Sequence, residues 1–173
     1  GILRWDMYKK GTYIVYGMSG PCLVEDITRL SIPGCDRKRK YYVLRPVITD
    51  KSTIYSPVDN EKVVIRDLMC RDEAEELIMQ ISDIPEIIVE NEKVREEQYK
   101  EIIKQINLRQ CIALLKTLLH KKKERQEEGR KFTTVDERYL KETEIIVSSE
   151  LALALGEERS VTDRKIRELI TAV

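Results

Sequence analysis

The chain has 173 residues, enough for one domain of ordinary size or two small ones, and its 31 basic and 31 acidic side chains give a formal net charge of zero. No apolar run approaches the roughly 20 residues of a membrane-spanning helix, so we predict a cytoplasmic protein without a membrane partner. The cysteines (Cys22, Cys35, Cys70 and Cys111) show no C-x-x-C spacing and the single histidine, His120, has no candidate ligand beside it, which predicts reduced thiols, no metal site and no cofactor.

The composition changes near residue 71. Before it lie six of the eight tyrosines, five of the seven glycines and four of the five prolines. After it, long Leu, Ile, Glu and Lys stretches with helical spacing take over. We interpret residues 1–6, which contain the only tryptophan, Trp5, as a cloning remnant. We therefore predict an α+β protein with two domains, residues 7–70 and residues 71–173.

The first domain is expected to be all-β. β-branched and aromatic residues form short runs separated by Gly, Pro and polar turns. These runs predict strands at Thr12–Tyr16, Cys22–Ile32, Tyr41–Val47 and Thr53–Val58, with a further one at Lys62–Ile65. Strands of this length and spacing favour a small antiparallel β-barrel of the Tudor or SH3 type.

One edge of that barrel is a candidate binding surface. The segments Arg29–Ile32 (RLSI) and Thr53–Ser56 (TIYS) are expected to offer an edge strand with Tyr55 exposed. An unshielded edge accepts a partner strand through main-chain hydrogen bonds. The alternative is ordinary sheet packing.

The second domain is expected to be a helical bundle of four or five helices with brief connections. Apolar residues at helical spacing, helix caps and glycine stops predict the helices. They are expected at Asp72–Ile81, at Asn91 to Ile106, from Asn107 to the region before Gly129, from Thr134 to Gly156 and from Ser160 onward.

Charge is distributed unevenly over this second domain. Residues 73–101 carry 3 basic and 10 acidic side chains, whereas residues 100–131 carry 10 basic and 4 acidic ones. The basic side chains gather at a predicted helix end and the loop after it: Lys121, Lys122, Lys123, Arg125, Arg130 and Lys131. They form either a solvated helix terminus or a surface that contacts nucleic-acid phosphates.

Catalysis is not expected. The sequence contains no G-x-S-x-G, Walker, G-x-G-x-x-G or H-E-x-x-H motif, and one histidine does not assemble a nucleophile, a base and an orienting group. We predict a protein that is not an enzyme.

A resemblance to a known family connects the two domains. The family's spacing of Gly, Val and Tyr is found in the first domain, and the second contains a long stretch similar to the family's helical domain. The matching positions are Gly11, Val15, Tyr16, Gly20, Val24, Ile27, Tyr42-Val43-Leu44, Ser56-Pro57-Val58 and the stretch Leu118–Gly156. The chain thus resembles the CarD/CdnL family of bacterial regulators, whose RNA-polymerase-interacting domain is shared with transcription-repair coupling factors.

The resemblance implies a transcription initiation regulator, cytoplasmic and associated with the bacterial nucleoid, that stabilises the promoter open complex through largely sequence-independent DNA contacts. It implies that Leu30, Ser31, Ile32 and Tyr55 contact the β subunit of RNA polymerase. It also implies that the helical domain meets promoter DNA near the upstream edge of the bubble. By position, the DNA contacts would be Arg95, Tyr99, Lys100, Lys121, Lys122, Lys131 and Arg138. We expect a monomer.

The chain departs from the family at one position. Many members insert a tryptophan into the minor groove, whereas residues 7–173 contain none and the aligned residue is Arg95. Glu96 and Glu97 also stand where relatives often carry basic residues. Either Arg95 or Tyr99 substitutes in the groove, or the DNA contact is weaker and more electrostatic. The alternative function is a protein adaptor that binds RNA polymerase and recruits another protein through its acidic residues 73–101 without touching DNA.

Overall fold

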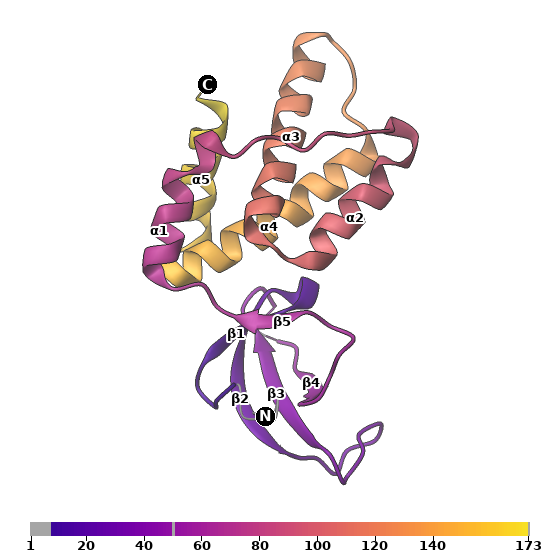
Figure 1. Cartoon of the computed structure of the whole chain (residues 1–173), viewed down its shortest axis with the longest axis vertical. Helices are drawn as coiled ribbons and strands as arrows, with labels where there is room; N and C mark the ends of the chain where they lie inside the picture. Colours follow the sequence, from indigo (N-terminus) through magenta and orange to yellow (C-terminus); the bar gives the residue numbers. More distant parts are fainter. Residues whose placement is uncertain (1–7, 50, 173) are drawn as a thin grey trace. The chain divides into compact units, whose positions relative to one another are not determined.

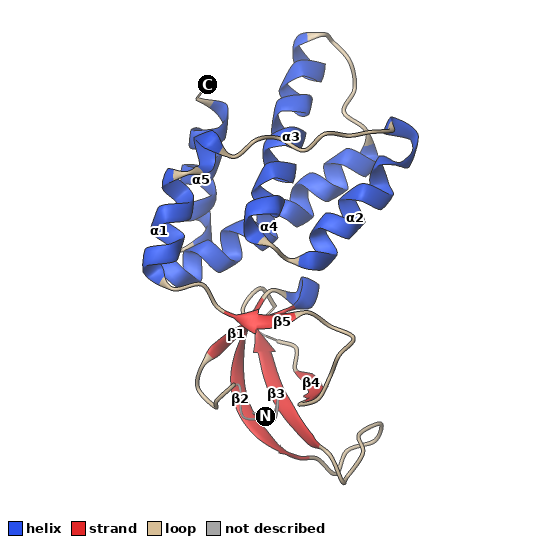
Figure 2. Cartoon of the chain, viewed as in Figure 1, coloured by secondary structure: helices blue, strands red, loops and turns tan. Residues whose placement is uncertain are grey.

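The computed structural model describes residues 8–49 and 51–172, so the predicted cloning remnant and Trp5 lie outside the described residues. The chain divides into two units, Gly1–Leu68 and Met69–Val173. The first contains the strands and the second contains all five α-helices of the described residues (Figure 1; Figure 2).

The first unit is built on one antiparallel sheet. Its strands are ordered β4-β3-β2-β1-β5, so that β4 and β5 stand at the two ends. Among the described residues these two strands do not pair with each other. The α+β class is confirmed, whereas closure of the sheet into the predicted barrel is not. The strands are β1 (Tyr13–Tyr16), β2 (Pro21–Arg29), β3 (Lys40–Pro46), β4 (Ile54–Pro57) and β5 (Ile65–Asp67).

Alternation along the strands places the core of the first unit on one face of the sheet. In β3, Tyr42 and Leu44 are buried, whereas Val43 between them is half-buried and Arg45 after them is exposed. A register shift between Val24 and Asp26 in β2 interrupts this alternation and allows Ile27 to pack against the same core. The buried cluster consists of Ile14, Cys22, Val24, Tyr42, Leu44 and Val58.

Gly17 is required in the connection between β1 and β2. It opens a 3-10 turn, η2 (Gly17–Ser19), with a φ of 48° that residues with a Cβ rarely adopt. A Cβ added at Gly17 would lie 2.7 Å from Cγ1 of Val63. The glycine therefore meets both a backbone and a packing requirement.

The second unit packs its helices around α3 and α4. The central helix α4 contacts α1, α3 and α5, and α2 lies against α3 and α4. No helix among the described residues is long and apolar enough to cross a membrane. The α-helices are α1 (Arg71–Met79), α2 (Arg95–Gln105), α3 (Leu108–Glu127), α4 (Thr134–Leu155) and α5 (Arg159–Thr171), and two 3-10 turns, η3 (Ile81–Asp83) and η4 (Glu92–Val94), lie between α1 and α2.

Local capping residues fix the helix ends. The Asn107 side chain accepts a hydrogen bond from the backbone N–H of Gln110 and caps α3, as predicted. The cap of α4 is Thr133 rather than the predicted Thr134, and it accepts from the backbone N–H of Asp136 at 3.2 Å. Gly156 ends α4 in the left-handed conformation, as predicted.

Two buried residues hold the connections before and after α2. Lys116 of α3 is 7% exposed and its ammonium donates to the backbone carbonyls of Ile81, Ser82 and Ile84 at 2.8, 3.3 and 2.6 Å. Ile106, between α2 and α3, is 1% exposed and has a φ of 51°, in the left-handed region that a β-branched residue rarely adopts.

Candidate functional site

The end strand β4 is the first candidate binding surface. It pairs with β3, Tyr55 lying opposite Val43, and among the described residues it has no strand on its other side. Ile54 and Ser56 point toward the core, whereas Tyr55 is 43% exposed. An end strand of this kind presents free main-chain donors and acceptors to a partner strand. The predicted edge position of Tyr55 is confirmed.

The predicted edge position of Arg29–Ile32 is wrong. Arg29 is the last residue of β2, which lies between β3 and β1 in the sheet, and Leu30, Ser31 and Ile32 belong to the connection that follows. Leu30 is half-buried, and Ser31 and Ile32 are exposed. These residues remain accessible, but β3 separates their strand from that of Tyr55.

In the second unit, a buried carboxylate organises the candidate DNA-contacting residues. Asp136, in the first turn of α4, has no exposed surface. Nε of Arg95 lies 3.0 Å from its Oδ1 and Nζ of Lys121 lies 3.0 Å from its Oδ2. Glu92 adds a second carboxylate, 3.2 Å from Lys121. Arg95 also donates to the hydroxyl of Thr133, the α4 cap. We call Glu92, Arg95, Lys121 and Asp136 the Asp136 cluster.

The electrostatics of the Asp136 cluster follow from burial and ion pairing. Burial by itself raises the pKa of Asp136, but the contacts from Lys121 and Arg95 outweigh burial and hold that pKa below its ordinary value. Burial, assisted by the nearby charge of Asp136, raises the pKa of Tyr99 above its ordinary value. At neutral pH the cluster thus contains an ionised aspartate beside a neutral tyrosine.

Three of the predicted DNA contacts are buried or paired within the second unit. Tyr99 is 0% exposed and its ring packs edge-on against that of Tyr139, with centroids 5.4 Å apart, so it cannot enter a DNA groove without leaving the core. Arg95 and Lys121 have side chains only 19% and 16% exposed and are held by Asp136. Residue spacing on a helix did not reveal these partners, because they come from other helices.

The remaining predicted DNA contacts lie at the surface, most of them beside an acid. Lys100 lies 3.7 Å from Glu96, and Arg138 is paired with the same carboxylate. Lys131 is exposed. The ammonium of Lys122 lies 3.1 Å from Glu137 and above the ring of Phe132. The structure therefore does not bring the predicted residues together on one uncompensated basic face.

Sequence reasoning missed the acids that neutralise this region. Glu92 belongs to the acidic stretch of residues 73–101, and Glu96 stands where relatives often carry basic residues, but neither position indicates a partner. The predicted cap at Thr134 gives Asp136 no capping role. The capping pattern Thr133-x-x-Asp136 was the available signal for Asp136. Among the described residues, no group of three or more His, Cys, Asp or Glu side chains could hold a metal ion.

Comparison with known proteins assigns the first unit. Residues 8–69 match the family model described as the CarD-like/TRCF RID domain. No curated protein matches the chain. The match covers the strands β1 to β5 and does not extend into the helices. The first unit of this chain is therefore a member of the CarD-like/TRCF RID domain family, as the resemblance predicted.

Proposed function

We propose that the chain is a non-enzymatic regulator of transcription initiation, which binds the β subunit of RNA polymerase through its first unit and stabilises the promoter open complex through its second. The observation that carries this proposal is the RID match over residues 8–69, because that family is named for interaction with RNA polymerase. A domain of this family in the first unit indicates that the chain is a transcription-related protein. The DNA contacts and the stabilisation of the open complex are proposals that go beyond this domain match.

Strand addition at β4 is the proposed mode of polymerase binding. The unpaired side of β4 offers main-chain hydrogen bonds, and Tyr55 offers an exposed aromatic ring at the centre of the strand. Leu30, Ser31 and Ile32 supply further contacts if the polymerase segment extends past the end of β2. Main-chain bonds give affinity in this mode and Tyr55 gives specificity.

The variant Tyr55→Glu tests this contact. A carboxylate at this position places an unpaired charge in the interface, so we expect loss of co-purification with the polymerase β subunit. Tyr13→Glu is the matched control, because Tyr13 is 39% exposed on β1, which belongs to the same sheet but is separated from β4 by β3 and β2. Equal retention of Tyr55→Glu and wild type by polymerase would refute the placement.

The proposed DNA contact is electrostatic and made by surface cations. Lys100, Lys131 and Arg138 are exposed and able to reach phosphates, whereas Tyr99 is too deeply buried to serve as an aromatic wedge. Contacts made only to melted DNA favour the open complex by their differential free energy. A coupling of about 1 to 3 kcal/mol would raise the open-complex population about 5- to 150-fold.

Open-complex lifetime tests the DNA contact. The double variant Lys100→Glu/Lys131→Glu should shorten the lifetime conferred by wild type while co-purification with polymerase is retained. Arg164→Glu on α5 is the control, because Arg164 is exposed and has no ion-pair partner among the described residues. Equal lifetimes for wild type and the double variant would remove the DNA contact from the proposal.

The adaptor function is the second candidate, favoured by the internal pairing of Arg95 and Lys121. In that case the exposed acids of residues 73–101 recruit another protein. Retention on promoter DNA distinguishes the two candidates: a gain over polymerase alone, lost with rising salt, supports DNA contact, and no gain supports the adaptor.

A further inference from the structure

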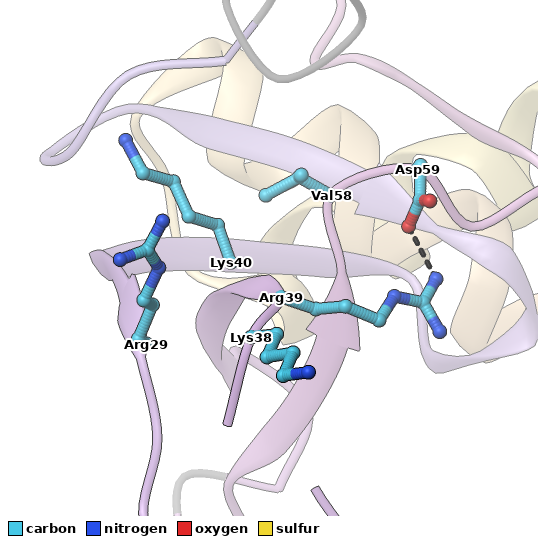
Figure 3. Close-up of a pocket in the computed structure, with 6 residues that line it drawn as sticks. All are labelled: Arg29, Lys38, Arg39, Lys40, Val58 and Asp59. Atoms are coloured by element: carbon cyan, nitrogen blue, oxygen red, sulfur yellow. Dashed lines mark hydrogen bonds and ion pairs between the residues drawn. The ribbon is translucent and has the colours of Figure 1, made fainter. Parts of the chain in front are cut away.

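A hollow of about 310 Å³ opens at one end of the sheet in the first unit. Four basic side chains, one acid and one apolar side chain line it: Arg29, Lys38, Arg39, Lys40, Asp59 and Val58 (Figure 3). The basic residues come from the end of β2, the connection to β3 and the start of β3. This group plays no part in the polymerase contact proposed above.

The sheet register builds one wall of the hollow. Arg29 and Lys40 are direct cross-strand partners, and the backbone N–H of Val58 donates to the carbonyl of Lys40. Arg29 and Lys40 therefore lie next to each other on one face of the sheet, and Val58, the residue after β4, lies beside Lys40. Figure 3 shows the Arg29 and Lys40 side chains extending in the same direction. Like charges directly opposite each other, with Cβ atoms about 4.5 to 5.5 Å apart, destabilise a sheet.

Only one of the four cations in the hollow is neutralised. Arg39 is paired with Asp59. Among the residues that the structure describes, the side chains of Arg29, Lys38 and Lys40 have no ion-pair or hydrogen-bond partner. The lining therefore carries a net charge of about three positive, from four cations and one acid. This contrasts with the Asp136 cluster, where acids of the chain already neutralise the cations.

We propose that this hollow binds successive phosphates of a nucleic-acid backbone. In the free protein, the positive charges of Arg29 and Lys40 repel each other across the strand pair. An anion bound between them would remove this repulsion, and the relief favours binding. The cations run across adjacent strands about 4.8 Å apart and onto the hairpin tip, which forms an extended array. A nucleic-acid strand presents one charge about every 3.4 Å of its axis and fits such an array better than an isolated carboxylate does.

The phosphate site is separable from the proposed polymerase contact. Ile54, Ser56 and Val58 alternate with Tyr55, so the hollow and the Tyr55 side chain lie on opposite faces of the sheet. The inference goes beyond the proposed function, because it requires neither polymerase nor the cations of the second unit.

Fluorescence anisotropy of a labelled duplex of arbitrary sequence tests the site with the full chain and without polymerase. The variant is Arg29→Gln/Lys40→Gln. Its matched control is Lys9→Gln/Lys62→Gln, which removes two exposed lysines elsewhere in the same unit. Loss of two phosphate contacts should lower the slope of log affinity against log salt by about 1.8. Between about 50 and about 200 mM salt, wild type should therefore lose about 12-fold more affinity than the variant does.

The single variant Lys38→Gln guards against a folding defect, because Lys38 lies in the β2–β3 connection outside the strand pairs. Its slope should fall by about 0.9, and the control double variant should keep the wild-type slope. Equal slopes for wild type and all three variants overturn the proposal. Unchanged slopes together with lost polymerase retention would assign the hollow to an acidic segment of the polymerase and would also overturn it.

Discussion

The ammonium of Lys121 in α3 lies 3.0 Å from Oδ2 of Asp136 in α4, a side chain with no exposed surface. Arg95, at the start of α2, binds the other oxygen of the same carboxylate. One aspartate thus ties together three helices. The family resemblance implied that both cations contact DNA, but both are already paired with a buried carboxylate of the second unit.

Replacing this aspartate should destabilise the second unit. Asp136→Asn leaves Arg95 and Lys121 largely buried without their counter-charge, so we expect the free energy of unfolding to fall by about 3 kcal/mol. Urea denaturation followed by circular dichroism measures the change. Glu97→Gln is the control, because Glu97 is exposed and unpartnered among the described residues. Equal stabilities of the two variants would show that the buried pair does not contribute.

The same residue predicts a pH dependence. The folded pKa of Asp136 is held below its unfolded value of about 3.9, so its ionised form stabilises the fold above that pH, and this contribution is lost as the pH falls through the folded pKa. The stability difference between wild type and Asp136→Asn should therefore be constant near neutrality and shrink below about pH 3.9. Burial raises the pKa of Glu144, so the contribution of Glu144 to the pH dependence of stability has the opposite sign. This contribution is the same in wild type and Asp136→Asn and therefore cancels in the difference. A difference that grows with acidity would contradict the assignment.

Lys116 should contribute to stability rather than to any surface function. Its ammonium donates to three backbone carbonyls around η3, and Lys116→Met leaves these acceptors unpaired. We expect a loss of about 2 kcal/mol in thermal or urea unfolding. Lys104→Met removes an exposed lysine of α2 and should leave stability within about 0.5 kcal/mol of wild type. Similar losses in both variants would exclude a specific role for the carbonyl contacts.

Thiol reactivity should follow burial. Burial raises the pKa of Cys22 to about 11, whereas Cys70 is exposed before α1 with its thiol near Glu73. Iodoacetamide at about pH 8 should therefore alkylate Cys70 well before Cys22, as peptide mapping by mass spectrometry would show. In urea, the two should react at similar rates. Early modification of Cys22 in the folded protein would contradict its placement in the core.

Local signals were the predictable part of the fold. The Asn107 cap and the Gly156 stop depend on contacts within one turn, and the sequence predicts them correctly. The α+β class follows from the change in composition near residue 71. The predicted cap of α4 is wrong by one residue, because the adjacent threonines at 133 and 134 have the same side chain and the same capping ability.

Non-local partners were the part that could not be predicted. Sheet order decides that Tyr55 lies on an end strand and that Arg29 ends an interior one, yet both segments have similar alternation in sequence. Arg95 and Asp136 are 41 residues apart, and no spacing rule connects them. The family resemblance implied that Tyr99 contacts DNA, but its ring is buried and packs against that of Tyr139.

Ile106 has a consequence for motion within the second unit. Its left-handed backbone costs about 1 to 2 kcal/mol, which the burial of its side chain offsets. A glycine would relax that corner but leave a void beneath it. A rotation of α2 away from α3 would remove the Ile106 side chain from its buried position. The junction therefore resists bending, and α2 and α3 should move together as one rigid body.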